Sequence, residues 1–200
     1  MKVEIEAKWL EVDHDDLKIK LKDLGAKQTR PLTRMTRAIF DFPDGRLGKI
    51  HGWVRVRDEG DGITMSYKQV DNSSIDGTKE ICLNVDNFDE AIDFLKQIGL
   101  KQKAFQETKR ESWVLDGVEI ELDEWPWLPP FVEIEADNEI KLAGVAEKLG
   151  FKMSQAMHGS VNFVYAKYYD VTRDDVNSWK EIKFQEIPKW LADKKKEAKE

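Results

Sequence analysis

Polar and apolar residues alternate along several short stretches of the chain, beginning near its start. Residues 3–9 read VEIEAKW, so ionisable side chains occupy every second position and apolar side chains fill the others. Because the side chains of a β-strand alternate between its two faces, Glu4, Glu6 and Lys8 share one face of a predicted strand. The ordinary interpretation of one such strand is an edge with a solvated face.

The same alternation recurs with charges of one sign on each stretch, which the ordinary interpretation does not explain. In residues 51–57, Arg55 and Arg57 share a face, and Lys68 lies on the polar face of residues 63–70. Carboxylates return on residues 118–123 (VEIELD) and 131–135 (FVEIE). Helical spacing of apolar residues predicts helices over 13–24, 87–98, 138–149 and 160–169.

The polar faces of the strands are predicted to point into the protein. Most connections are hairpins or single helices, so the sheet is antiparallel and the fold class is α+β. The amphipathic helices need apolar surface, which the apolar faces of the strands supply. If the sheet closes, the polar faces line a hydrated cavity with an acidic wall and a basic wall.

Composition excludes several classes of protein. The net charge is −7, which argues against a nucleic-acid-binding protein held by phosphate contacts. The single cysteine, Cys82, excludes a disulfide framework and a cysteine-rich zinc site, and its strand-like surroundings predict a packed thiol. Without an apolar signal region or an apolar run of about 18 residues, we expect a cytoplasmic protein that binds no membrane.

The two walls together predict the ligand. Charges removed from water need partners, so an empty cavity of this kind would be strongly destabilising. Mg²⁺ or Mn²⁺ suits a site built from carboxylate oxygens and usually bridges to phosphate. Arginine and lysine bind phosphate oxygens. The predicted ligand is therefore a metal-bound polyphosphate.

At this point the residues resemble a known family. Glu4-x-Glu6-x-Lys8 matches the signature of the CYTH superfamily, the triphosphate tunnel metalloenzymes, which includes class IV adenylyl cyclases, thiamine triphosphatases and inorganic triphosphatases. The resemblance continues in order and spacing from residue 1 to about residue 170. It is carried by Trp53-x-Arg55-x-Arg57, Lys68, Lys109-Arg110, Asp123-Glu124-x-Pro126 and Phe131-Val132-Glu133-Ile134-Glu135.

The resemblance implies a closed antiparallel barrel of eight strands with flanking helices, whose lumen binds triphosphate. It implies a tunnel domain over residues 1–170, followed by a charged, helical extension over 171–200, and it allows a homodimer. The implied metal ligands are Glu4, Glu6, Asp123, Glu133 and Glu135, with Glu121 assisting. The implied phosphate ligands are Lys8, Arg37, Arg55, Arg57, Lys68 and Arg110.

Three functions stay open at this stage. Metal-dependent hydrolysis of a small-molecule triphosphate (inorganic, nucleoside or thiamine) is favoured, because it requires no pocket for a particular base. A class IV adenylyl cyclase would bind ATP with the same groups, and a non-catalytic polyphosphate-binding module would bind without turnover. For catalysis we single out Glu4, Glu6 and Lys8. The crowded surroundings of Lys8 are expected to alter the proton affinity of its amine. Lys152 is an open candidate for a further phosphate contact.

Overall fold

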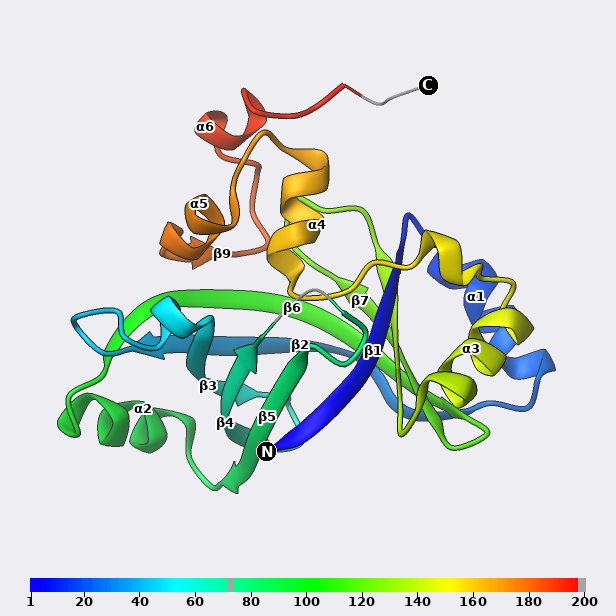
Figure 1. Ribbon diagram of the computed structural model, residues 1–200, viewed down its shortest axis with the longest axis horizontal. Helices are drawn as coiled ribbons and strands as arrows, with labels where there is room; N and C mark the ends of the chain where they lie inside the picture. Colours follow the sequence, from blue (N-terminus) through cyan, green and yellow to red (C-terminus); the bar gives the residue numbers. More distant parts are fainter. Residues whose placement is uncertain (72–73, 198–200) are drawn as a thin grey trace.

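Nine β-strands form the sheet in the computed structural model, which describes residues 1–71 and 74–197 (Figure 1). They are β1 (Lys2–Leu10), β2 (Lys27–Asp41), β3 (Gly52–Asp58), β4 (Ile63–Val70), β5 (Thr78–Val85), β6 (Lys101–Leu115), β7 (Val118–Glu124), β8 (Phe131–Ala136) and β9 (Glu181–Ile182). Eight follow one another in the order β2-β3-β4-β5-β1-β8-β7-β6, and β2 also pairs with β6. This confirms the predicted closed antiparallel barrel of eight strands. The short β9 adds in parallel to β6.

Six α-helices and two short 3₁₀ helices complete the described fold. They are α1 (His14–Asp23), α2 (Phe88–Gln97), α3 (Glu139–Lys148), α4 (Val161–Tyr168), α5 (Arg173–Ser178), α6 (Lys189–Ala192), η1 (Gly48–Ile50) and η2 (Met153–Gln155). Within the described residues, no helix has the length and apolar character needed to cross a membrane.

Local sequence determines where the helices begin and end. The side chains of Asp13 and Asn87 accept hydrogen bonds from the second and third backbone N–H groups of α1 and α2. Gly25 and Gly99 follow these helices with φ of 76° and 99°, a backbone conformation that favours glycine. The predicted helices over 13–24 and 87–98 are therefore confirmed to within a residue or two.

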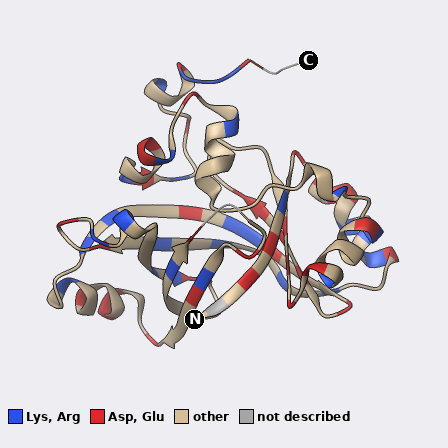
Figure 2. Cartoon of the chain, viewed as in Figure 1, with Lys and Arg blue, Asp and Glu red and all other residues tan. Residues whose placement is uncertain are grey.

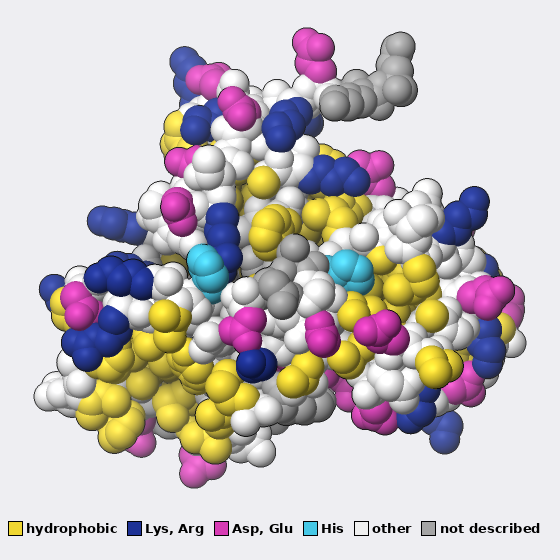
Figure 3. Space-filling model, viewed as in Figure 1, with side chains coloured by type: hydrophobic (Ala, Val, Ile, Leu, Met, Phe, Trp, Pro, Cys, Tyr) yellow, Lys and Arg dark blue, Asp and Glu magenta, His cyan; other side chains and the backbone are white. Residues whose placement is uncertain are grey.

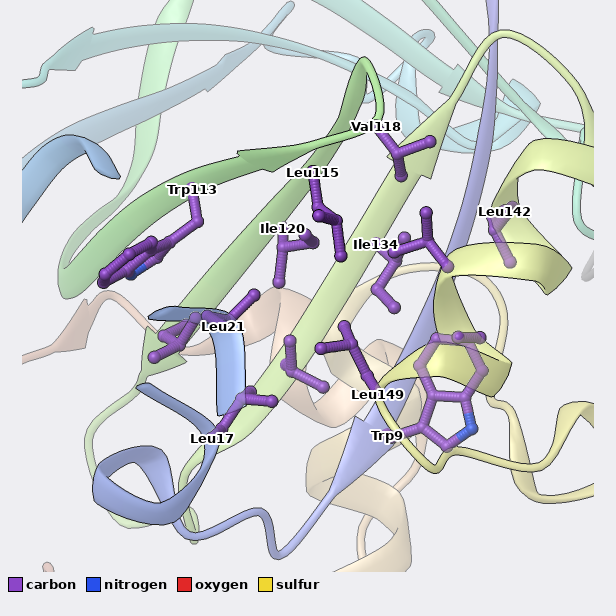
Figure 4. Packing of buried hydrophobic residues seen from close by; sticks show 14 of the residues in the cluster. Trp9, Leu17, Leu21, Trp113, Leu115, Val118, Ile120, Ile134, Leu142 and Leu149 are labelled. Carbon is purple, nitrogen blue, oxygen red and sulfur yellow. The ribbon is translucent and has the colours of Figure 1, made fainter. Parts of the chain in front are cut away.

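The helices cover the outer, apolar faces of the barrel strands. Leu17 and Leu21 of α1 and Leu142 of α3 pack with Ile120 of β7 and Ile134 of β8 (Figure 4). All five side chains are buried, and burying each contributes about 1.5–3 kcal/mol to stability. A second core lies beneath α2, against the outer faces of β2 and β3. The barrel interior is thereby left to the polar faces.

The segment after α4 packs on one side of the barrel (Figure 1). Its buried residues join Trp125, Phe131 and, from α4, Tyr165 in a third core. They are Tyr169, Val171, Val176, Trp179, Ile182 and Leu191. The structure describes the extension predicted over 171–200 as far as residue 197. This part of the chain forms α5, β9 and α6. The division between domain and extension stays a prediction.

One part of the outer surface lacks a helical cover. Ile81 and Leu83 of β5 are 48% and 53% exposed, and hydrophobic side chains gather over α2 and the neighbouring strands in Figure 3. Cys82 is exposed as well, so the prediction of a packed thiol is wrong. The reason is that β1 pairs with β5 only at residues 78–80, which leaves the second half of β5 with β4 as its neighbour.

Candidate active site

The barrel lumen is a single cavity of about 610 Å³. Figure 2 shows charged positions running along β1 and across the middle of β2 and β6. Every residue singled out from the resemblance as a metal or phosphate ligand lines this cavity. They are Glu4, Glu6, Lys8, Arg37, Arg55, Arg57, Lys68, Arg110, Glu121, Asp123, Glu133 and Glu135. Their convergence is what the alternating pattern predicted, whereas their individual roles stay predictions.

β1 shows how the sequence determines which side chains face the lumen. Glu4, Glu6 and Lys8 point into the lumen and are only 4–7% exposed, while Ala7 and Trp9 pack in the core on the other face. A side-chain period of two separates the two sets, and a shift of one residue would exchange them.

Strand pairing places like charges directly opposite one another on both sides of the lumen. On the acidic side, Glu6 of β1 lies opposite Glu135 of β8, and Glu133 lies opposite Glu121 of β7. On the basic side, Arg37 of β2 lies opposite Arg57 of β3. Directly opposed like charges destabilise a sheet unless counter-charges compensate them.

The acidic side is partly neutralised from within. The Nζ of Lys8 lies 3.3 Å from Glu6 and 3.1 Å from Glu133. Arg110 donates two hydrogen bonds to Asp123, from Nε to Oδ1 at 2.7 Å and from Nη2 to Oδ2 at 2.6 Å. Burial opposes the charged form of Arg110, but Asp123 and Glu121 raise the pKa of Arg110 well above its usual value.

Lys8 is held as a cation by its neighbours. Burial disfavours its charge, but Glu133 and Glu6 outweigh that effect and raise the pKa of Lys8. Burial likewise favours protonated Glu133, yet Lys8 and Arg110 lower the pKa of Glu133 below its usual range. These opposite shifts describe a buried ion pair, and a lysine so held is a poor proton acceptor. The catalytic role of Lys8 stays a prediction.

A second group of ion pairs joins β1, β4 and β5. Lys68 Nζ donates to both carboxylate oxygens of Glu4, at 3.0 and 2.9 Å, and Arg55 Nη2 donates to Glu80 at 3.1 Å. Burial raises the pKa of Glu4 to about 8. Burial acts in the same sense on Glu80, but a hydrogen bond with Glu4 and the charges of Lys68 and Arg55 lower the pKa of Glu80 to about 2.

On the basic side, Arg55 and Arg57 pair with Glu80 and Glu59, but one guanidinium group differs. Arg37 is buried and forms no ion pair with any described residue; its Nη2 donates to Thr108 Oγ1 at 2.8 Å, and its guanidinium lies 4.7 Å from the Trp125 ring centroid. The Nε atoms of Arg37 and Arg55 are buried without a hydrogen-bond partner. Burial, reinforced by Arg55 and Arg57, lowers the pKa of Arg37 well below its usual value. An anion bound here would compensate these charges.

Comparison with known proteins now assigns the fold. Residues 2–168 match the CYTH domain. The chain belongs to the CYTH family. Among curated proteins, none matches the chain.

Solved structures share the CYTH fold. The PH1012 protein from Pyrococcus horikoshii OT3 is 25% identical over 76% of this chain and 93% of its own, with a TM-score of 0.61. A protein from Vibrio parahaemolyticus, provisionally assigned as an adenylate cyclase, is 16% identical over 82% and 98%, with a TM-score of 0.70. HpAC1 from Hippeastrum, provisionally assigned as an adenylyl cyclase and described with a dominant triphosphatase activity, is 15% identical over 78% and 91%, with a TM-score of 0.53.

The carboxylates of this CYTH barrel fit a divalent cation by their chemistry. Glu6, Glu133 and Glu135 bring oxygen ligands together from adjacent strands, which is the donor set that Mg²⁺ and Mn²⁺ prefer. No three acidic, histidine or cysteine side chains among the described residues converge on one point as a ready-made metal site. Because Lys8 and Arg110 hold the carboxylates, metal binding would have to exchange an ion pair for a coordination bond.

Several residues of the CYTH lumen escaped the sequence analysis. Glu59 accepts from Arg57 Nε at 2.8 Å and from Arg30 Nη1 at 2.7 Å, and both arginines lower the pKa of Glu59 to about 2 against the effect of burial. Glu59 continues the alternation of Arg55 and Arg57, but its place in a predicted turn obscured that signal. Lining residues that the pattern did not assign to the cavity include Arg30, His51, Glu59, Trp125 and Arg173.

Two positions could not be placed from the pattern. Irregular pairing of β2 with β6 between residues 28 and 33 shifts the parity of β2, so the inward orientation of Arg37 could not be deduced from Arg30 or Arg34. Lys152 is exposed and does not line the cavity. Its carbonyl accepts from Trp9 Nε1 at 3.0 Å on the outside of the barrel.

Proposed function

We propose that this protein is a divalent-metal-dependent triphosphatase that hydrolyses a small-molecule triphosphate inside its barrel. The observation that carries the proposal is the buried guanidinium of Arg37, which pairs with no carboxylate among the described residues and lies opposite Arg57. A chain of phosphoryl groups supplies several negative charges in a row, and arginine binds phosphate oxygens with paired N–H groups.

Each wall has a distinct part in the proposed reaction. Arg37, Arg55 and Arg57 bind phosphate oxygens and stabilise the charge that develops on them during transfer. Glu4, Glu6, Asp123, Glu133 and Glu135, with Glu121 assisting, would hold Mg²⁺ or Mn²⁺. A divalent cation at such a site polarises phosphate oxygens and lowers the pKa of a bound water.

The lysines and Arg110 complete the phosphate site in this proposal. Lys68 would exchange its carboxylate partner, Glu4, for a phosphate oxygen, and Lys8 would remain protonated and orient Glu6 and Glu133. Arg110 sits between the two walls and is already paired with Asp123. The substrate-binding energy must therefore compensate the ion pairs that the substrate and metal displace.

A class IV adenylyl cyclase is the second candidate, because Trp53 and His51 also line the cavity and offer surface for a base. Hydrolysis remains the first, since no hydrogen-bonding pattern specific for adenine accompanies them. HpAC1, which shares the fold, is described with a dominant triphosphatase activity, and this motivates an assay of hydrolysis beside cyclisation.

Product analysis tests the proposal directly. The protein is incubated with inorganic tripolyphosphate or with ATP, each with Mg²⁺ and with Mn²⁺, and the products are separated by anion-exchange chromatography. We expect orthophosphate, with Glu133→Gln lowering kcat at least about 100-fold because an acidic group of the proposed metal site is lost. Glu119→Gln, on a lining carboxylate outside the proposed ligand set, serves as the control.

The other outcomes favour other functions. Cyclic AMP with pyrophosphate as the products of ATP would make the protein a cyclase. Binding of tripolyphosphate without turnover under all four conditions would make it a non-catalytic polyphosphate-binding module. Cytoplasmic location and homodimer formation stay predictions from the sequence.

A further inference from the structure

Arg173 brings a positive charge to the cavity from outside the barrel strands. It is the first residue of α5 and lies beyond residue 168, where the match to the CYTH domain ends. Arg173 and Asn177 both line the cavity and lie four positions apart, so they share one face of the helix. The segment after the family domain thus contributes to the wall of the site.

The guanidinium of Arg173 has no counter-ion. It is half-buried, and no described residue forms an ion pair or hydrogen bond with it. Asp175 is engaged by Thr172, whose backbone N–H and hydroxyl both donate to that carboxylate at 2.7 Å. Burial lowers the pKa of Arg173, and the charge of the exposed Asp174 does not offset this effect. A cation in this state would gain from an anionic ligand.

The surrounding contacts hold α5 in a fixed position. Asn162 Nδ2 donates to Asn177 Oδ1 at 2.7 Å, which ties α5 to α4 beside the cavity. Val176 and Trp179 are buried in the core that also contains Trp125. Because α5 is anchored by packing and by its capping box, Arg173 is presented to the cavity without a large ordering cost.

Arg173 is the charged residue that lines the cavity from residues 159–177. Asp174 and Asp175 follow it in the first turn of α5, but neither lines the cavity. Arg110, by contrast, is paired with Asp123. The part of the cavity wall that α5 forms therefore presents a positive charge to a ligand, which suits an anionic group better than a neutral one.

We propose that Arg173 is a substrate-binding residue that contacts the outermost phosphate of a linear inorganic polyphosphate whose inner phosphates lie against Arg37, Arg55 and Arg57. A nucleoside at this end would place a neutral group beside Arg173, whereas a phosphate chain places a charge there. The inference rests on the proposed function, because it assigns the class of substrate to the same cavity.

Binding of chains of different length tests the inference without turnover. Isothermal titration calorimetry in EDTA measures the affinity of the full chain and of Arg173→Gln for pyrophosphate, tripolyphosphate and tetrapolyphosphate. We expect Arg173→Gln to weaken binding of the two longer chains about tenfold, as for the loss of one charged hydrogen bond, and to change pyrophosphate binding less than about twofold. Lys180→Gln removes the same charge from an exposed site outside the cavity and should match the wild type for all three ligands.

The outcomes separate the inference from the proposed function. Equal loss for all three chain lengths, or no loss for any, would overturn the role of Arg173 while leaving the lumen as a phosphate site. If the wild type binds none of the three chains in EDTA and the product analysis with Mg²⁺ and Mn²⁺ shows no turnover, the proposed function fails as well. Arg173→Lys keeps the charge but loses the planar fork, so it should restore part of the affinity for the longer chains. If Arg173→Gln does not fold, the same dependence on chain length, reduced in size, is expected from Arg173→Lys.

Discussion

Two guanidinium groups in one cavity, the buried Arg37 and the partly buried Arg110, have opposite surroundings. Arg110, between β6 and β7, makes a two-point contact with Asp123, and this partner together with Glu121 raises its pKa. Arg37, on β2, bonds to the hydroxyl of Thr108, and burial among other arginines lowers its pKa. The charge of Arg110 is therefore compensated by a carboxylate of the protein itself, whereas the charge of Arg37 is not.

The difference separates groups that maintain the fold from groups available to a ligand. A paired charge such as Arg110 helps to stabilise the barrel, and removing it would leave Asp123 buried and alone. An unpaired charge such as Arg37 costs folding free energy, which an anionic ligand can return as binding free energy. The lumen therefore contains charges that the protein neutralises itself, such as Arg110, and an unpaired charge, Arg37, that is available to phosphate. The sequence shows both kinds as alternating charges.

The largest expected effect tests this separation through stability. Arg110→Met should destabilise the protein by about 3–5 kcal/mol, because Asp123 remains buried without its partner. Arg37→Met should change stability by less than about 1 kcal/mol, because it removes a charge that has no counter-ion and keeps a similar volume. Urea unfolding at pH 7 measures both. Equal destabilisation by the two variants would contradict the distinction.

A smaller effect concerns Glu59, the carboxylate that pairs with Arg57 and Arg30 on the basic side. Arg57 and Arg30 lower the pKa of Glu59 from 4.5 to about 2 in the folded protein. A lowered pKa contributes stability above the unfolded value, and this contribution is lost as pH falls from about 4.5 toward 2. At pH 7 it amounts to about 3 kcal/mol by linkage.

The matched variant isolates that contribution. Glu59→Gln should be less stable than the wild type at pH 7, and the difference should shrink as the pH is lowered from 5 to 2. Urea unfolding at several pH values gives the difference directly. A gap that stays constant across this range would show that Glu59 does not titrate with the predicted lowered pKa.

The smallest effect concerns the polar contact of Arg37. Thr108 is fully buried, and its hydroxyl accepts from Arg37 Nη2. Thr108→Val keeps the shape and removes the acceptor, so we expect a loss of about 1 kcal/mol in stability. A loss of stability as large as that of Arg110→Met would mean that the hydrogen bond to Thr108 alone compensates the burial of the Arg37 charge.

Local alternation was enough to predict the antiparallel strands, the helices on their apolar faces and the inward orientation of Glu4, Glu6 and Lys8, whereas closure into an eight-stranded barrel was implied by the family resemblance. A period of two and an amphipathic helix are properties of short segments, so one sequence reveals them. The pairing inside the lumen depends on which strands become neighbours. For that reason Glu59 and Arg173 were not assigned to the cavity.

The wrong prediction for Cys82 has the same origin. β1 pairs with β5 only at residues 78–80, so Cys82 lies beyond the paired stretch. That pairing joins segments distant in sequence and is not present in the local pattern.

The most direct test of the account is the affinity of tripolyphosphate for Arg37→Met, measured by calorimetry in EDTA beside the wild type. Arg34→Met is the control, because Arg34 lies on the same strand, is exposed and pairs with Glu107 outside the cavity. Loss of charged hydrogen bonds should weaken binding about 10- to 100-fold in Arg37→Met and leave Arg34→Met unchanged. Wild-type affinity in Arg37→Met would contradict the claim that the side of the lumen with the unpaired Arg37 is the phosphate site.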